Sequence, residues 1–412
     1  MQRKVVVTGA GIVCPLGSNL AVTWSRLIAG DVAVCRGIFT NAATGTQLSA
    51  PIARLPEGAL SQPPKAVAGL IDRFTQMALQ AASAALEHSC LTIGAADRTR
   101  IGVASGTCMG GIGETEAGFD SIYVRKRARV HPFTVIRTMY NAPAAFISAQ
   151  LDISGPVLAY STTCSSSAVA IGEASRIIRH GYADVMIAGG SESLLTYSAI
   201  NCWSSAQLLA PVADPPSNSC RPFAADRAGT SLGEGAAFVV LESLDHAINR
   251  GAPILAELAG YGCTGDSAHV TQPSVEGQGA PMRAALSDAN MHATEIGYVH
   301  AHGTGTKAND ATETAAIRSV FGAAVRGLAV SSSKAQIGHL VGAAGAVGFV
   351  LGLQAIRSQV VPPTANLTHA DPECDLDYVP GLGRQTKDLR AAMCNAFGFG
   401  GTATSLVVRA FP

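Results

Sequence analysis

The chain has 412 residues, which is enough for one large domain or for two or three closely packed ones. Apolar residues make up 48% of the sequence and charged residues only 14%, a composition that excludes a disordered chain and favours an α/β protein with a large core. The 29 Lys and Arg residues balance the 29 Asp and Glu residues, so no overall field would attract nucleic acid or an anionic membrane surface.

Residues 1–17 predict a buried strand followed by a turn. A signal peptide is disfavoured because Thr8, Gly9 and Gly11 interrupt the apolar run. The segment TGAGIVCPLG begins like a dinucleotide-binding fingerprint, but Cys14 stands where the third glycine is required, and no acidic residue follows at the spacing needed for a ribose. We therefore expect no nucleotide site here.

Short β-branched segments then alternate with Ala-rich helical segments along the chain. In the first part VVVTGA, IGVASGT and DVMIAGG are separated by helical patterns, and AELAGYGCTG, IGYVHAHGT and LAVSSSK repeat the rhythm in the second. The alternation predicts a largely parallel sheet covered by helices and a weak internal duplication, with halves at residues 1–250 and 251–412. The longest apolar run, Leu340 to Leu353, is too short to span a bilayer and predicts a core helix.

Two insertions interrupt this rhythm, at residues 120–150 and 201–225. Insertions of this kind usually serve partners or substrates. The second is rich in proline, and the first carries a basic cluster, Arg125, Lys126, Arg127 and Arg129.

The ten cysteines form no CxxC pair and no dense framework, which fits free thiols in a reducing cytoplasm and disfavours a metal site. Cys164 is different because TTCSSS places it between a polar strand end and the start of a helix. Unpaired backbone N–H groups and the positive end of the helix dipole would stabilise a thiolate there. We therefore predict that Cys164 is a nucleophile.

Two histidines stand in glycine-rich turns that also connect a predicted strand to a predicted helix. They are His302 in AHGTGTKANDATE and His339 in SSSKAQIGHLVGAAGA. A lone histidine is more often structural, but three such turns, carrying Cys, His and His, would meet at one end of a parallel sheet. Asp310 and Glu313, three residues apart, are interpreted as a structural capping box.

The motifs TTCSSS, HGTGT, KAQIGHL with GAAGA, and CNAFGFGGT, in this order and spacing, resemble the β-ketoacyl-ACP synthase family over essentially the whole chain. The resemblance implies a thiolase-like, five-layered αβαβα fold of two similar halves. It also implies a decarboxylative condensation in which Cys164 holds the acyl chain, while His302 and His339 stabilise the enolate derived from malonyl-ACP. No cofactor or metal is expected, since phosphopantetheine arrives on the carrier protein.

The resemblance assigns further positions. Lys334 would support the two histidines, and Phe399 would gate the site and share the oxyanion hole with the backbone N–H of Cys164. Thr304 and Thr306 would bond the phosphopantetheine arm. Two bulky residues, Met109 and Trp203, fall where the family lines its acyl pocket, and ordinary core packing is the alternative for both.

The sequence departs from the fatty-acid type of the family at several positions. Gly348 replaces a glutamate that would pair with Lys334, and Ala403 replaces an asparagine. At both Gly348 and the motif HGTGT, the sequence resembles polyketide ketosynthases. The usual basic residues for the carrier protein are replaced by Gly69, Leu70 and Gln207, so the docking patch would shift to the cluster at 125–129, unless that cluster is only a solvated charge run.

The expected partners are an acyl carrier protein and a second subunit, either a copy of this chain or a chain-length-factor-like homologue. Alternatives are a non-elongating acyltransferase that uses Cys164 without decarboxylation, and a non-catalytic partner subunit. The retained cysteine and both histidines argue against the last. The pathway, fatty-acid or specialised polyketide and polyene synthesis, stays open, with the departures favouring the specialised route.

Overall fold

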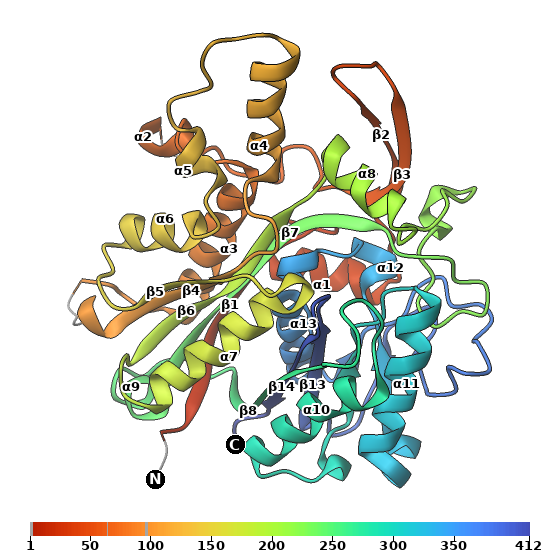
Figure 1. Cartoon of the computed structure of the whole chain (residues 1–412). Coiled ribbons are helices and arrows are strands. Elements are labelled where there is room, and N and C mark those ends of the chain that lie inside the picture. Colours follow the sequence, from red (N-terminus) through yellow and green to blue (C-terminus); the bar gives the residue numbers. More distant parts are fainter. Residues whose placement is uncertain (1–2, 64, 95–97) are drawn as a thin grey trace.

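A single mixed sheet runs through the middle of the molecule in the computed structural model, which describes residues 3–63, 65–94 and 98–412 (Figure 1). The main path has the order β10-β9-β13-β14-β8-β1-β7-β6-β4-β5. The strands before residue 250 are β1 (Val5–Val13), β4 (Ile101–Gly106), β5 (Val157–Tyr160), β6 (Val185–Ser193) and β7 (Leu232–Ser243). The later strands are β8 (Ala256–Gly265), β9 (Tyr298–His300), β10 (Ala329–Ser331), β13 (Ala391–Phe397) and β14 (Thr402–Arg409).

The strand order repeats on the two sides of the central β1–β8 pair. Outward from β1 come β7, β6, β4 and β5, and outward from β8 come β14, β13, β9 and β10. In both repeats, the first strand along the chain is followed outward by the last, then the second-last, and then the second and third of these five strands. The pairing directions repeat as well: antiparallel, antiparallel, parallel and parallel on each side. The change from one repeat to the other falls at the short helix α9 (Leu244–Asn249).

Within each repeat four of the five strands run in the same direction, as the expected largely parallel sheet requires, but β7 and β14 run antiparallel to both of their neighbours and β1 pairs antiparallel with β8. Helices cover both faces of the sheet, so every strand carries a continuous apolar run whatever its direction. Such runs do not reveal the direction of a strand.

Five layers result from the packing of helices on the two repeats. The outer helix of the first is α3 (Arg73–Ser89), those of the second are α10 (Val275–Ala289) and α11 (Lys307–Phe321), and the middle layer holds α7 (Ser166–Arg179) and α13 (Ala344–Ser358). The middle layer packs against both halves of the sheet in the largest hydrophobic cluster (Figure 1). This is the αβαβα arrangement that the resemblance implied.

Each repeat brings a strand and an outer helix together through a pair of glycines. A Cβ on Gly9 of β1 would lie 2.0 Å from the carbonyl oxygen of Ala85 in α3, and a Cβ on Gly260 of β8 would lie 2.1 Å from that of Ala285 in α10. Such distances exclude any side chain, so the glycines of TGAG allow close packing of strand and helix. They form no phosphate-binding loop.

The two sheet edges differ. The edge strand β10 is covered by the C-terminal segment, since the Val330 N–H donates to the carbonyl of Asp377 at 2.8 Å. At the other end β5 is the last strand on the path, and its Val157 and Leu158 are exposed.

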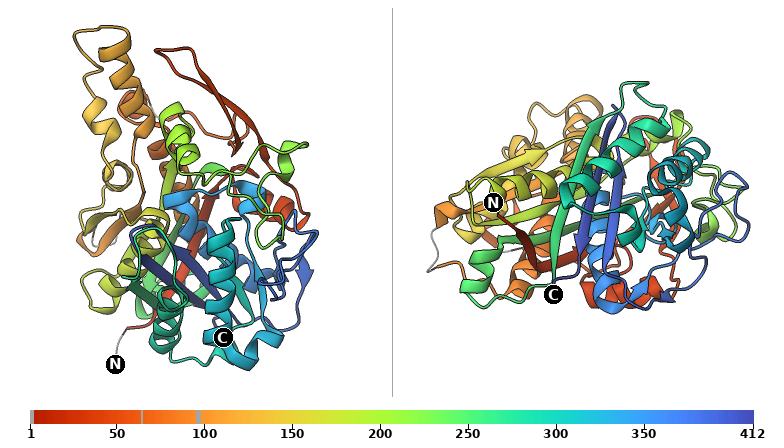
Figure 2. Two further views of the ribbon diagram at one scale, coloured as in Figure 1. Left: turned by 45° about the vertical axis from the view of Figure 1, so that its right-hand side comes forward. Right: turned by 90° about the horizontal axis from the view of Figure 1, so that it is seen from below.

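The two insertions stand on the N-terminal repeat. Residues 112–138 form a projecting hairpin, α4 (Ile112–Phe119), a π-helical turn (Asp120–Val124) and α5 (Thr134–Thr138), which leads into α6 (Ala142–Leu151) (Figure 2). The second insertion follows α8 (Tyr197–Ser205) as a long loop. A β-hairpin, β2 (Val34–Thr40) and β3 (Gln47–Ala53), projects nearby, and α1 (Leu20–Ile28), α2 (Lys65–Ala68), α12 (Lys334–Ile337), β11 (Val360–Val361) and β12 (Arg384–Gln385) complete the elements.

One described helical run, Val341–Ser358, is long and apolar enough to cross a membrane by length and composition alone. However, 78% of it is buried inside the molecule, where α13 packs against α7 and β13. It is a core helix, as the sequence predicted.

Candidate active site

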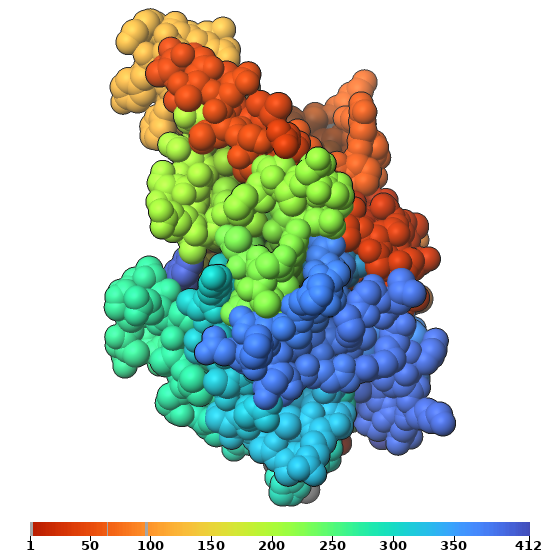
Figure 3. All heavy atoms as spheres, turned by 90° about the vertical axis from the view of Figure 1, so that its right-hand side faces the viewer, coloured from red at the N-terminus to blue at the C-terminus, as the bar shows by residue number. Residues whose placement is uncertain are grey.

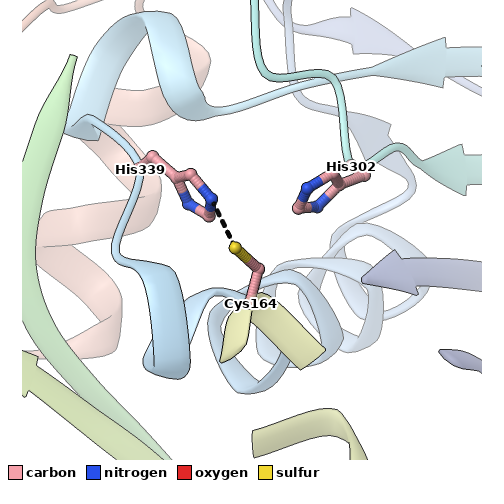
Figure 4. A group of neighbouring side chains, drawn as sticks. All are labelled: Cys164, His302 and His339. Atoms are coloured by element: carbon pink, nitrogen blue, oxygen red, sulfur yellow. Dashed lines mark hydrogen bonds between the residues drawn. The ribbon is translucent and has the colours of Figure 1, made fainter. Parts of the chain in front are cut away.

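Three connections between a strand and a helix bring Cys164, His302 and His339 together (Figure 4). Cys164 follows β5, His302 follows β9, and His339 follows β10 and α12. Their sulfur and ring nitrogens lie within 4.8 Å of one another, and all three side chains are buried. The convergence predicted from the sequence is confirmed. These atoms could also ligate a metal ion by distance alone, but a thiol facing two imidazoles is equally the arrangement of a nucleophile with its N–H donors.

The turn that carries Cys164 is a single 3₁₀ turn, Thr163–Ser165, directly before α7. Thr163 has a φ of 54°, a left-handed conformation that a β-branched residue rarely adopts. The surrounding fold holds the turn in this conformation, which brings the Cys164 sulfur to the histidines. Burial raises the pKa of the Cys164 thiol to about 12, and the nearby Lys334 charge acts in the opposite direction. In the resting site burial therefore outweighs the helix end that the sequence suggested as the source of a thiolate.

His339 is oriented from both sides. The Val341 N–H donates to its Nδ1 at 3.1 Å, so the ring proton is on Nε2, which lies 3.1 Å from the Cys164 sulfur. Burial and then Lys334 hold the pKa of His339 well below its ordinary value. The neutral ring therefore offers an N–H to the sulfur.

His302 faces the same space, with its ring centre 5.4 Å from that of His339 and 5.7 Å from that of Phe397. Burial, Lys334 and the neighbouring histidines hold its pKa well below the ordinary value, so this ring is also neutral. The buried Lys334 ammonium donates to the carbonyl oxygen of His302. That bond ties the lysine to the backbone of the turn.

Asp310 and Glu313 do not form a capping box, because α11 begins earlier and is capped by Thr306. Asp310 and Glu313 both belong to α11, and their side chains are buried. Glu313 accepts from the N–H groups of His302 and Gly303 at 2.8 and 2.7 Å, and Asp310 accepts from those of Phe223 and Gly305. Both residues are structural, as expected, but they hold the turn that carries His302 and do not cap the helix.

Phe399 lies in the turn between β13 and β14, where Gly400 and Gly401 both have a φ of 83°. Thr163 donates to the Phe399 carbonyl at 3.0 Å, which links this turn to the cysteine turn. The Phe399 ring is 39% exposed and lies 6.3 Å from the Trp203 ring. It stands at the entrance to the site.

A pocket with a cavity volume of about 160 Å³, partly open to solvent, reaches the cysteine and both histidines. Thr304 and Thr306 line it, with their hydroxyls 2.9 Å apart, and so does Trp203. Trp203 also packs edge-on against His339, with ring centres 6.0 Å apart. Met109 does not line this pocket but packs against the apolar cluster around Cys164. In Figure 3 a small dark-blue patch from the last part of the chain shows between the green and teal segments, and all three of these parts of the chain contribute residues to the pocket lining.

The basic cluster at 125–129 lies at the tip of the projecting hairpin, and all four side chains are exposed. Figures 1 and 2 show this tip well away from the loop before α10, which lines the pocket. The structure does not bring the cluster to the pocket entrance, and its role in docking stays a prediction.

The sequence analysis missed several polar residues of the site, among them Gln278, Asn309 and His300. Gln278 and Asn309 line the pocket, with the Gln278 amide donating to Asn309 at 3.0 Å. His300 is buried and ends β9, two residues before His302. Its only signal in the sequence was this position in VHAHGT, close to a predicted site residue.

Comparisons with known proteins agree with this geometry. The model "Beta-ketoacyl synthase, N-terminal domain" matches residues 2–247, and "Beta-ketoacyl synthase, C-terminal domain" matches residues 255–368. Nodulation protein E of Rhizobium meliloti (strain 1021) is 39% identical over 99% of this chain and 100% of its own length. The 3-oxoacyl-[acyl-carrier-protein] synthase 2 of Coxiella burnetii is also 39% identical, over 99% of this chain and 98% of its own.

Solved structures match over the full length. The ishigamide ketosynthase/chain length factor has a TM-score of 0.91 at 30% identity, and a β-ketoacyl synthase from Burkholderia phymatum STM815 has 0.89 at 34%, each with complete coverage of both chains. Family models and relatives therefore point to one family, and the solved structures to one fold. The chain belongs to the β-ketoacyl synthase family of acyltransferases, with its thiolase-like fold.

Proposed function

We propose that this β-ketoacyl-acyl-carrier-protein synthase carries its acyl chain on Cys164 and condenses it with malonyl-ACP under the control of His302 and His339. The observation that carries the assignment of roles is the convergence of one sulfur and two neutral imidazoles in one pocket. A thiol supplies the covalent link, and fixed N–H donors stabilise developing negative charge.

In the first half-reaction the Cys164 sulfur attacks the acyl thioester of a carrier protein. A sulfur–carbon bond forms on Cys164, the carrier's sulfur–carbon bond breaks, and the thiol proton leaves with the carrier's sulfur. The His339 N–H, 3.1 Å from the sulfur, stabilises the thiolate as it forms. Backbone N–H groups of Cys164 and Phe399 hold the oxyanion, at about 3 kcal/mol per donor.

In the second half-reaction malonyl-ACP loses carbon dioxide, and the electron pair of the broken bond forms an enolate. His302 and His339 donate to its oxygen. The enolate carbon attacks the Cys164 thioester, which releases the β-ketoacyl-ACP and leaves the cysteine as a thiolate. Burial and, after it, the Lys334 charge keep both rings neutral, and Thr304 and Thr306 bond the pantetheine arm along the pocket wall.

A specialised pathway is favoured over general fatty-acid synthesis. Gly348 and HGTGT depart from the fatty-acid type, and relatives named nodulation protein E and 3-oxoacyl-ACP synthase 2 show similar identity to this chain. A solved ketosynthase with a TM-score of 0.89, from a type II polyketide system, is described in complex with its acyl-carrier protein. An acyl carrier protein is accordingly the partner that delivers both substrates, in a reducing compartment such as the cytoplasm that suits ten free thiols.

A second subunit of the same fold is proposed to pair with the open edge of the sheet. The exposed Val157 and Leu158 of β5 lie on that edge, and the projecting hairpin adds the exposed Phe119 and Tyr123. An unpaired apolar edge strand favours pairing with another strand. Two relatives by structure are described together with a chain length factor, so the partner is either a copy of this chain or such a homologue.

Mass spectrometry of carrier-bound products tests the proposal. The enzyme is incubated with malonyl-ACP and a panel of acyl-ACPs, and the expected products are chains extended by one ketide unit. Acyl transfer to or from Cys164 without release of carbon dioxide would instead establish the non-elongating acyltransferase. Native mass spectrometry of the purified chain, with and without a chain-length-factor-like protein, distinguishes the two kinds of dimer.

A further inference from the structure

His300 is a buried histidine that the reaction described above does not use. It ends β9, two residues before His302, and its Nε2 lies 3.1 Å from the Ser333 hydroxyl. On the other side the ring meets α13 at Gly348, where a Cβ would lie 2.7 Å from Nδ1. The imidazole therefore fills a space that exists only because residue 348 has no side chain.

Lys334 directly follows Ser333, the residue to which this ring bonds, and its charge acts on the ring. Its ammonium donates to the His302 carbonyl, and among the described residues no carboxylate oxygen lies within 4.0 Å of it. Burial and the lysine charge together lower the pKa of His300 to about 3, so the ring is neutral. The lysine thus has a neutral neighbour where a carboxylate could have neutralised its charge.

Other groups also act on this charge and on the nucleophile. Burial lowers the pKa of Lys334, while Glu313, Cys164, Cys220 and Asp310 act to raise it. Those near Cys164 are His339, Glu192 and Cys108. Glu192 and burial raise the pKa of the Cys164 thiol, and Lys334 is the main group that lowers it.

We propose that His300 is a positioning residue: as a neutral side chain it occupies the place next to Ser333 and Lys334, so that no carboxylate there adds to Glu313 and Asp310 in weakening the action of the lysine charge on Cys164. Gly348 is its necessary counterpart, since it leaves room for the ring. The inference deepens the proposed function, because it explains how a deeply buried cysteine of this chain becomes reactive. With Gly348 in place of a glutamate, the buried site carries one negative charge fewer.

Alkylation of Cys164 by iodoacetamide tests this without any carrier substrate. Only the thiolate reacts, so at a fixed pH below the thiol pKa the rate reports the thiolate fraction. His300→Glu places a carboxylate beside Lys334 and should slow alkylation roughly tenfold or more, whereas the matched neutral variant His300→Gln should stay within about twofold. Peptide mass spectrometry reads Cys164, with the exposed Cys35 and Cys90 as controls in the same sample.

Two results would overturn the proposal. Equal rates in the two folded variants would mean that His300 only fills space, because Glu and Gln have the same size. The second result concerns the contact between the His300 ring and Gly348, and it tests the proposal even if the His300→Glu variant does not fold. Gly348→Ala should lower the Tm, and in the double variant with His300→Ala this loss should disappear, since the added methyl then meets no ring; additive losses would refute the contact.

The two levels of inference fail separately. If wild-type enzyme makes no extended product but the Glu and Gln variants still differ in alkylation, the proposed condensation is wrong and the role of His300 stands. If condensation occurs and the variants do not differ, only the role of His300 is wrong.

Discussion

The two repeats build the same five-strand arrangement and use it for different chemistry. In each repeat, the loops that follow the two outermost strands of the main path lie near the site. In the N-terminal repeat these are the segments after β4 and β5, which carry Met109 and Cys164. In the C-terminal repeat the segments after β9 and β10 carry His302 and His339. Cys164 and His339 therefore occupy equivalent connections.

The difference shows how the reaction is divided. In the proposed function, the N-terminal repeat would supply the covalent nucleophile, one apolar wall and the projecting insertions, while the C-terminal repeat would supply the N–H donors, the buried lysine and the glycine turn with Phe399. Neither repeat contains a working site by itself. The following predictions test this division, beginning with the largest effect.

Removing the nucleophile should abolish condensation. Cys164→Ala deletes one sulfur and little core, so we expect the rate to fall at least about a thousandfold with the Tm nearly unchanged. Cys108→Ala is the matched control from the other connection of the same repeat, because it keeps the backbone N–H bond of residue 108 to Glu192. It should stay within about threefold of wild type. Mass spectrometry of extended acyl-ACP measures both, and condensation by the Cys164 variant near the wild-type rate would refute the assignment.

The histidines of the C-terminal repeat should control decarboxylation even without acyl transfer. Cys164→Gln mimics an acylated cysteine and should still release carbon dioxide from malonyl-ACP. Adding His302→Ala or His339→Ala should lower that release about a hundredfold, as expected for the loss of one oxyanion donor. Undiminished release in both double variants would show that the rings do not stabilise the enolate.

The same reaction has a predicted pH dependence. Burial and Lys334 hold the pKa values of His302 and His339 well below the ordinary value, so both rings remain neutral down to about pH 6, where an exposed histidine would be largely protonated. Release of carbon dioxide by the Cys164→Gln variant should therefore not decline as the pH is lowered to about 6. A decline with the midpoint of an ordinary imidazole would contradict the burial argument.

The basic hairpin tip tests whether the N-terminal repeat also recruits the carrier protein. Arg125→Glu with Arg127→Glu should raise the KM for acyl-ACP about tenfold and weaken its salt dependence, because exposed docking charges are screened by salt. Acyl-pantetheine lacks the acidic protein and should be unaffected. Arg326→Glu with Lys387→Glu, two exposed residues of the C-terminal repeat, is the matched control. Equal losses in both pairs would leave the cluster a solvated charge run.

The smallest effects should come from the pocket walls. Trp203→Ala and Met109→Gly should extend the longest acyl chain accepted on Cys164, while short chains are transferred at rates within about threefold of wild type. Trp203 lines the pocket and Met109 packs behind it, so the tryptophan should have the larger effect. Mass spectrometry of acylated enzyme gives the cutoff, and an unchanged cutoff in both variants would return them to ordinary core packing.

The sequence was sufficient for the fold and for the convergence of Cys164, His302 and His339, because all three stand in recognisable strand-to-helix turns. It was insufficient where the decisive fact is a contact between distant segments. His300 and Gly348 meet only in three dimensions, and Asp310 and Glu313 were three residues apart in a pattern that local rules assign to a helix cap. Strand direction was missed for the same reason, since β7 and β14 look like the parallel strands beside them.

The unequal edges of the sheet limit how large an assembly can become. A sheet open at both ends could add subunits indefinitely and grow into a fibre. Here the segment at Asp377 closes the β10 end of the main strand path, so addition at the ends of that path is possible only at β5. If two chains pair there around a two-fold axis, neither offers another free strand on the main path, and growth along that path stops at two.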